Sequence, residues 1–138
     1  MSDRMSLVLF SGTVDKLMAA SILATGAAAM DMEVELFLTF WGLQAFRKGA
    51  YQDNTAITKD YEEYAPAMFE AMQAKHVPTW MENLQAAREI GNVRIEACSM
   101  TMELYGLKLE DFEPIVDDVT GVASFIERAK DSKITLFL

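Results

Sequence analysis

The sequence predicts an α/β protein built around a mainly parallel sheet. Short hydrophobic runs bounded by turn residues recur along the chain with helical segments between them, which is typical of βαβ units. The chain has 138 residues. That length buries one hydrophobic core and is too short for two domains of ordinary size. We therefore expect a single domain over residues 1–138.

Four of the hydrophobic runs predict strands, and each is short and bounded by turn or polar residues. Parallel strands buried on both faces carry continuous apolar runs of this kind. We expect about five strands in all. The four runs are residues 7–10, 34–38, 93–97 and 134–138.

Helical periodicity and stop signals define the segments between the strands. An alanine-rich helix is expected over 15–30, a short helix near 43–48, and a helix that follows Pro78–Thr79 and stops at Gly91. After Cys98 a brief helical turn runs to Leu104 and closes at Gly106. Residues 49–79 form an irregular, partly helical insertion, with a mobile loop first and an amphipathic helix second. The spacing of Val122, Phe125, Ile126 and Ala129 predicts one face of a final helix.

The composition restricts the partners. The net charge of -9 repels a phosphate backbone, and the basic residues are scattered along the chain, so we expect no nucleic-acid partner. The longest mostly apolar stretch, residues 17–30, is too short to span a bilayer and is interrupted by polar residues, so we expect no membrane segment. A lone cysteine forms no internal disulfide, and the N-terminal apolar run is too short for a signal peptide. These features predict a cytoplasmic protein.

Cys98 is the candidate reactive residue. It lies where a strand gives way to a helix, and in parallel α/β sheets the carboxyl ends of the strands carry the ligands. The free amides at a helix start favour a thiolate, which is the nucleophilic form, and Ser99 and Thr101 add hydroxyl groups. A free cysteine is equally often a small buried hydrophobe, so position alone leaves both interpretations open.

The sequence lacks the residues that other cysteine, metal and nucleotide sites require. His76, the only histidine, lies in the irregular segment, and no second cysteine completes a CxxC pair. One histidine and one cysteine far apart predict no zinc site, and the acidic residues of 110–118 lack the spacing of a calcium loop. No glycine-rich nucleotide motif occurs. We expect no metal and no cofactor. Gly12 and Thr13 form a tight turn, and Trp41 and Gly42 follow the second strand.

Four blocks of residues together resemble the DsrE/DsrF-like sulfurtransferase family, and more narrowly its DsrE branch that carries a peroxiredoxin-like annotation. The resemblance covers nearly the whole chain, and the Phe-Trp-Gly-Leu and Cys-Ser-Met-Thr-Met sequences are its most specific parts. The blocks are residues 11–17, 24–30, 36–43 and 97–103.

The resemblance implies a single-domain, three-layer, flavodoxin-like fold and assembly into a homotrimer or homohexamer. It also implies that Cys98 accepts sulfane sulfur as a persulfide and passes it to a partner such as a TusA-like carrier or a rhodanese-like protein. Ser99, Met100 and Thr101 would then be the immediate setting of the cysteine. Gly12, Thr13, Trp41 and Gly42 would be possible pocket walls.

One segment departs from the family pattern, and two other functions stay open. Residues 52–77 contain no glycine and several acidic residues, where many relatives are rich in glycine and methionine, so no loop function is transferred. A non-catalytic subunit with Cys98 buried, which binds a small anionic ligand beside Gly12 and Trp41, is the second hypothesis. Peroxide reduction at Cys98 is the third.

Overall fold

The computed structural model describes residues 3–138 and contains a five-stranded sheet in which all strands are parallel. The predicted α/β, flavodoxin-like architecture is confirmed. The strand order is β4-β3-β2-β1-β5, so the last strand lies on the far side of the first. The strands are β1 (Arg4–Leu9), β2 (Glu33–Leu38), β3 (Val93–Cys98), β4 (Asp118–Thr120) and β5 (Ile134–Phe137).

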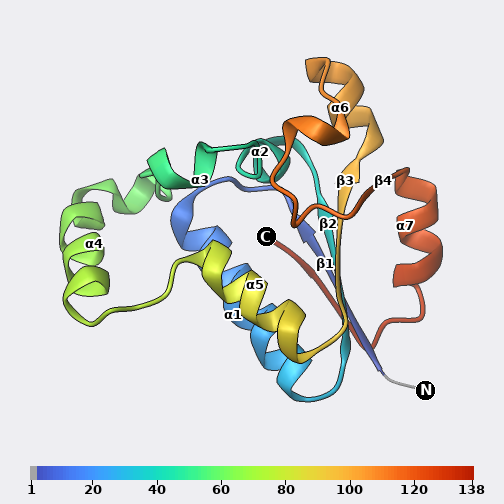
Figure 1. The fold of residues 1–138 in the computed structure, drawn as a ribbon, viewed down its shortest axis with the longest axis horizontal. Coiled ribbons are helices and arrows are strands. Elements are labelled where there is room, and N and C mark those ends of the chain that lie inside the picture. The colour runs from blue at the N-terminus through green and yellow to red at the C-terminus, as the bar shows by residue number, and fades with distance from the viewer. Residues whose placement is uncertain (1–2) are drawn as a thin grey trace.

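Helices cover the two faces of the sheet unequally (Figure 1). Helices α1 (Val14–Ala29) and α5 (Trp80–Ile90) pack side by side on one face, and the much shorter α7 (Val122–Ala129) lies on the other. The result is the expected three-layer arrangement.

The main core lies between the sheet and helices α1 and α5. Alternate strand residues point into it because successive side chains of a strand face opposite sides. On β1 these are Met5, Leu7 and Leu9, and Val34, Leu36 and Leu38 take the same positions on β2. The small residues predicted along α1 allow this close packing, and Ala20, Ala24 and Ala28 are buried there.

Helix α5 begins and ends where the sequence indicates. Thr79 and Glu82 form a capping box, in which the Thr79 hydroxyl accepts from the Glu82 amide and the Glu82 carboxylate accepts from the Thr79 amide. These bonds satisfy two amides that a helix start otherwise leaves free. Gly91 terminates the helix, as predicted.

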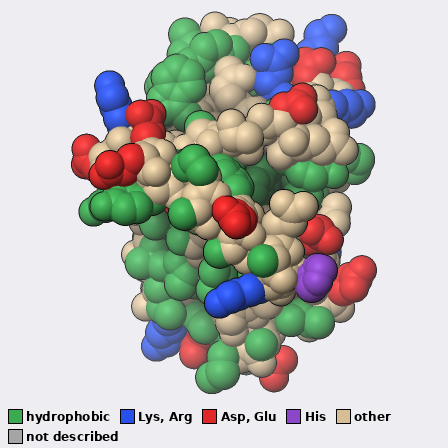
Figure 2. All heavy atoms as spheres, turned by 90° about the vertical axis from the view of Figure 1, so that its left-hand side faces the viewer, with side chains coloured by type: hydrophobic (Ala, Val, Ile, Leu, Met, Phe, Trp, Pro, Cys, Tyr) green, Lys and Arg blue, Asp and Glu red, His purple; other side chains and the backbone are tan. Residues whose placement is uncertain are grey.

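The insertion 49–79 is more helical than its sequence suggests. It contains α3 (Ala50–Asp53), the 3-10 helix η1 (Lys59–Tyr64) and α4 (Ala65–Ala74), and α4 lies at the far left of Figure 1, away from the sheet. Helix α4 confirms the helix expected in the second half. A cavity of about 330 Å³ between α4 and the body is lined by apolar groups that include Met18, Phe69 and Trp80. Figure 2 shows this side of the molecule, with a recess in its central part.

Four elements, α2, β4, α6 and the 3-10 helix η2, complete the description of the chain. Helix α2 (Phe40–Gln44) begins three residues before the short helix expected near 43–48, and β4 begins at the last residue of the acidic segment 110–118, where the sequence predicts no strand. Helix α6 (Ser99–Tyr105) ends at Gly106 with a positive φ of 63°, as its sequence predicts, and the 3-10 helix η2 (Leu109–Asp111) follows.

Candidate functional site

Cys98 is the last residue of β3 and the residue that precedes α6. Its side chain lies on the face of the sheet covered by α7, because it alternates with Ala97, which belongs to the opposite core. It is buried, with 7% of its surface exposed. The sequence therefore placed the cysteine correctly at a strand end, and the structure adds that it is covered.

Aromatic side chains form the cover. Phe37 of β2 and Phe125 of α7 stack with ring centroids 4.7 Å apart, and both belong to the same small cluster as Cys98. Val8 and Ala129 pack against this cluster from the side. The thiol thus borders an apolar surface on the side of α7.

Hydroxyl groups lie on the other side of the thiol. Thr101, in the first turn of α6, is buried, and its Oγ1 lies 3.1 Å from Oγ1 of Thr39 at the end of β2. The same Thr101 oxygen accepts a hydrogen bond from the Phe40 amide, at 3.1 Å. Phe40 has a positive φ of 48°, which is uncommon for a bulky residue. Thr101 thus contacts both residues that follow β2.

Two opposing effects act on the pKa of the Cys98 thiol. Burial raises it, because a charged sulfur is poorly solvated there, but hydrogen bonds from the Thr101 hydroxyl and amide, the Thr39 hydroxyl and the Met100 amide lower it. The hydrogen bonds prevail, and the pKa lies below the ordinary value of a cysteine. A lowered pKa increases the fraction of nucleophilic thiolate near neutral pH.

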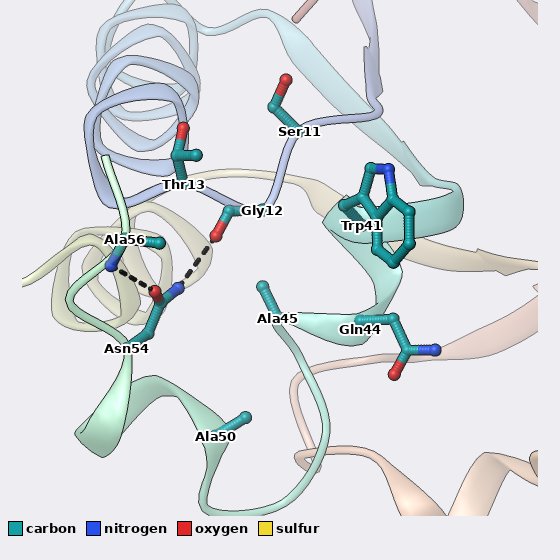
Figure 3. A pocket seen from close by; sticks show the side chains of 9 residues that line it. All are labelled: Ser11, Gly12, Thr13, Trp41, Gln44, Ala45, Ala50, Asn54 and Ala56. Carbon is teal, nitrogen blue, oxygen red and sulfur yellow. Dashed lines mark hydrogen bonds between the residues drawn. The ribbon is translucent and has the colours of Figure 1, made fainter. Parts of the chain in front are cut away.

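A separate cavity of about 430 Å³ opens beside the β1–α1 turn and α2 (Figure 3). Three of the predicted pocket residues, Gly12, Thr13 and Trp41, line it. Cys98 is not among its lining residues, so the structure does not bring the cysteine and this cavity together. The other lining residues are Ser11, Gln44, Ala45, Ala50, Asn54 and Ala56, so every lining side chain is uncharged.

The two predicted glycines, Gly12 and Gly42, serve close backbone contacts. A Cβ atom on Gly12 would lie 2.4 Å from the Trp41 carbonyl oxygen, and one on Gly42 would lie 2.1 Å from the Leu9 carbonyl oxygen. Gly42 is buried and packs against the end of β1, outside the lining of the cavity. The glycines therefore allow the β1–α1 turn and α2 to approach each other.

The start of α1 is occupied by the insertion. The Val14 amide donates to the Ala56 carbonyl, and the Asp15 carboxylate accepts from the amide and hydroxyl of Thr58. Asn54 adds a bond from its side-chain amide to the Gly12 carbonyl, drawn in Figure 3. The insertion thus occupies the Val14 amide and the Gly12 carbonyl of this turn, whereas the buried Thr13 hydroxyl has no hydrogen-bond partner among the described residues.

The remaining predicted residues, Ser99 and Met100, flank the cysteine at the surface. Ser99 is half-buried, with Gly121 beside it, and Met100 is 73% exposed. Trp41 and Tyr105 of α6 lie with ring centroids 6.4 Å apart, so Trp41 borders the cavity and also contacts the helix that begins at Cys98.

Residues 3–138 contain neither a candidate metal site nor a membrane-spanning helix. No group of three or more His, Cys, Asp and Glu side chains lies close enough to hold a metal ion there. Among these described residues, no helix has the length and apolar character needed to cross a membrane.

Three residues near the site receive no functional role from the sequence alone: Thr39, Phe125 and Arg128, whose Nη2 donates to Glu96 two residues before Cys98. Thr39 lies directly after the second expected strand, and Phe125 lies on the face of the expected final helix. The alternation of β2 carried a usable signal for Thr39, since it lies two residues after Phe37 and so on the same face. Phe125 and Arg128 come to the site only through the packing of α7, which no local pattern reveals.

The fold and the site together define a flavodoxin-like α/β protein with a buried cysteine of lowered pKa at a strand end. A family model described as the DsrE/DsrF/DrsH-like family matches residues 1–63 and 56–137. The chain belongs to this family, which confirms the resemblance seen in its sequence.

Two relatives and one solved structure are similar over almost the full length. The uncharacterized protein YrkE of Bacillus subtilis is 36% identical, with 99% of this chain and 98% of that protein aligned. The sulfur carrier protein DsrE2 of Allochromatium vinosum is 26% identical, with 98% of each chain aligned. The structure of MTH1491, a protein of unknown function from Methanobacterium thermoautotrophicum, superposes with a TM-score of 0.62 at 16% identity and covers 99% of this chain and 100% of its own. This last similarity concerns the fold.

Proposed function

We propose that the protein is a sulfur carrier in sulfur relay, which accepts sulfane sulfur as a persulfide on Cys98 and passes it to a partner thiol. The observation that carries the proposal is the lowered pKa of the Cys98 thiol at the end of β3. Membership of the family and similarity to a protein named as a sulfur carrier support it.

The transfer needs one thiol and no redox cofactor. The Cys98 thiolate attacks the outer sulfur of a donor persulfide, the donor S–S bond breaks, and the donor leaves as a thiolate. A partner thiolate then attacks the outer sulfur of the Cys98 persulfide and releases the Cys98 thiolate. Neither step needs an external oxidant or reductant. This agrees with a site built from one cysteine and two threonines.

The partners and the assembly are part of the proposal. We propose a TusA-like carrier or a rhodanese-like protein as the exchanging partner, a cytoplasmic location, and a homotrimer or homohexamer formed by single-domain chains. Ile22 and Leu23 of α1 are exposed, and so is Met30 just after this helix. An exposed apolar helix face of this kind favours contact with another chain.

Intact mass after incubation with a persulfide or polysulfide donor tests the proposal. The wild-type protein is expected to gain the mass of one or more sulfur atoms, and a reductant should remove it. Cys98→Ser is the matched control and should stay unloaded. Equal loading of the two proteins, or none of either, contradicts the proposal.

The burial of Cys98 favours a second candidate, a non-catalytic subunit that binds a small ligand in the cavity beside Gly12 and Trp41. The uncharged lining of that cavity suits a neutral ligand better than an anion. Iodoacetamide separates the two functions: the carrier should be alkylated in its native state, whereas the binding subunit should react only after unfolding.

A further inference from the structure

Helix α7 contacts the sheet through a small number of side chains. Phe125 is its one fully buried residue, and it lies in the cluster with Cys98 and Phe37. Val122 and Ile126, which were predicted to share the buried face, are exposed instead. The apolar attachment of α7 is therefore concentrated at the ring that covers the thiol.

Arg128 supplies the polar attachment of α7. Its Nε donates to Oε1 of Glu35 on β2, and its Nη2 donates to Oε1 of Glu96 on β3 at 2.7 Å. Its carbonyl oxygen accepts from Nη1 of Arg4 at 2.9 Å. One side chain thus ties the end of α7 to two neighbouring strands.

Loss of the ion pairs of Arg128 would leave the two carboxylates, Glu35 and Glu96, with less compensating charge. Glu35 is 4% exposed and Glu96 is 1% exposed, and Glu96 lies two residues before Cys98 on the same face of β3. Buried carboxylates without a cation are strongly unfavourable. Arg94, the other partner of Glu96 at 3.2 Å, belongs to β3 itself and therefore does not hold α7.

We propose that α7 is a cover over Cys98 and that Arg128 is the positioning residue that keeps it closed. In sulfur transfer the Cys98 thiolate must reach the outer sulfur of the donor in line with the S–S bond that breaks, and the Phe125 ring packs in the buried cluster that contains this thiol. Movement of α7 away from Glu35 and Glu96 exposes the thiol to a donor. The role of the cover in sulfur transfer rests on the proposed function. Whether α7 covers Cys98 at all depends only on how accessible the thiol is.

Native-state alkylation by iodoacetamide tests the cover, with the rate recorded from acid to alkaline pH. Phe125→Ala and Arg128→Gln are expected to raise the plateau rate, where the thiol is fully ionised, by about tenfold or more, since each removes one attachment of α7. Because the plateau is independent of the thiol pKa, a rise there reports access. Unchanged plateau rates in both variants overturn the proposal.

Two controls separate the cover from other effects. Arg94→Gln removes a partner of Glu96 without touching α7 and should keep the wild-type plateau rate. Leu84→Ala opens a cavity in the core on the opposite face, so it lowers stability without releasing α7. Acceleration by Leu84→Ala equal to that by Phe125→Ala would show reaction through global unfolding and overturn the cover. Persulfide loading is scored separately, so an accessible thiol that never loads contradicts the sulfur-carrier function alone.

Discussion

Thr39 shows how a single residue changes the chemistry of the cysteine. Its hydroxyl lies 3.1 Å from that of Thr101, and both hydroxyls lower the pKa of the Cys98 thiol against the effect of burial. The Phe40 amide donates to Thr101, so removing the Thr101 hydroxyl would also leave an amide unsatisfied. Thr39 is therefore the cleaner position for a test.

Thr39→Val should raise the pKa of the Cys98 thiol. Valine has the shape of threonine without its hydroxyl, and the lost hydrogen bond, worth about 1 kcal/mol, favours the thiolate in the wild type. The measurement is the pH dependence of the alkylation rate, whose midpoint should move upward. Thr39→Ser keeps a hydroxyl and should hold the wild-type midpoint. A midpoint unchanged in Thr39→Val would remove Thr39 from the site.

The same lowered pKa predicts a pH-dependent contribution of Cys98 to stability. A thiol whose pKa is lower in the folded protein stabilises the fold fully above its unfolded value of 9.0, and this stability is lost as pH falls through the folded pKa. The free energy of unfolding of wild type, minus that of Cys98→Ser, should therefore rise with pH up to the unfolded value of 9.0. Denaturant unfolding at several pH values measures the difference. A flat or falling difference contradicts the lowered pKa.

The contact between the end of β1 and α2 is tested by Gly42→Ala. The new Cβ would lie 2.1 Å from the Leu9 carbonyl oxygen, so either the strand end or the helix must move. Overpacking of a well-packed site costs about 1–3 kcal/mol, and a lower unfolding temperature should report it. Thr39 directly precedes α2, so the displacement should also move its hydroxyl away from the Cys98 thiol. The pKa of the thiol would then rise, and alkylation of Cys98 near neutral pH should be slower.

Gly26→Ala is the matched control for the same change of residue. A Cβ at Gly26 has no heavy atom within 4 Å, and the position lies inside α1. Alanine should stabilise a helix interior by about 0.5–1 kcal/mol relative to glycine. If the two variants shift the unfolding temperature in the same direction, the close contact at Gly42 does not matter for stability.

Elements with a strong local signal could be predicted from the sequence. Thr79 and Gly91 delimit α5, Gly106 ends α6, and continuous apolar runs indicate β1, β2 and β3. These signals are local because caps, positive φ angles and buried strands each require particular residue types at particular positions. The position of Cys98 at a strand end follows from them.

The other elements depend on tertiary contacts. Strand β4 has three residues in an acidic stretch and forms because it pairs with β3, where Thr120 is the partner of Cys98. Helix α7 shows a clear apolar periodicity, yet Ile126 is exposed. The helix contacts the sheet through Phe125 and Arg128 instead. The cover over the cysteine was therefore invisible in the sequence, where Phe125 lies 27 positions from Cys98.

At the scale of the whole molecule, the two faces of the sheet differ in how they are stabilised. The face under α1 and α5 holds an extended apolar core. The face under α7 holds the small cluster around Cys98 and, beside it, the buried carboxylates Glu35 and Glu96 with their arginines. The first face buries most of the apolar core, and the second combines fewer buried apolar side chains with Cys98. Local opening is expected on the face with less buried apolar surface.

The buried carboxyl of Glu96, on the face under α7, should make the free energy of unfolding depend on pH. Burial raises the pKa of Glu96 and so does the adjacent Glu35 carboxyl, while Arg128 and Arg94 oppose the shift without cancelling it. A carboxyl whose pKa is raised in the folded protein binds more protons there than in the unfolded chain, so its contribution to stability falls as pH rises from about 4.3 through the folded pKa. Glutamine does not titrate, so the Glu96→Gln variant should not show this decrease in stability. The free energy of unfolding of Glu96→Gln, minus that of wild type, should therefore increase over this pH range.

Denaturant unfolding at intervals between acid and neutral pH measures this difference. Glu127→Gln removes one exposed carboxylate from α7 and is the control for a change in net charge. The increase should be absent from the control because Glu127 lies outside the buried cluster and pairs only with Lys130 among the described residues. A difference for Glu96→Gln that decreases with pH would mean that the arginines outweigh burial. In that case Arg128 would hold α7 more tightly at neutral pH than in acid, and Cys98 would be better covered where its thiolate is most abundant.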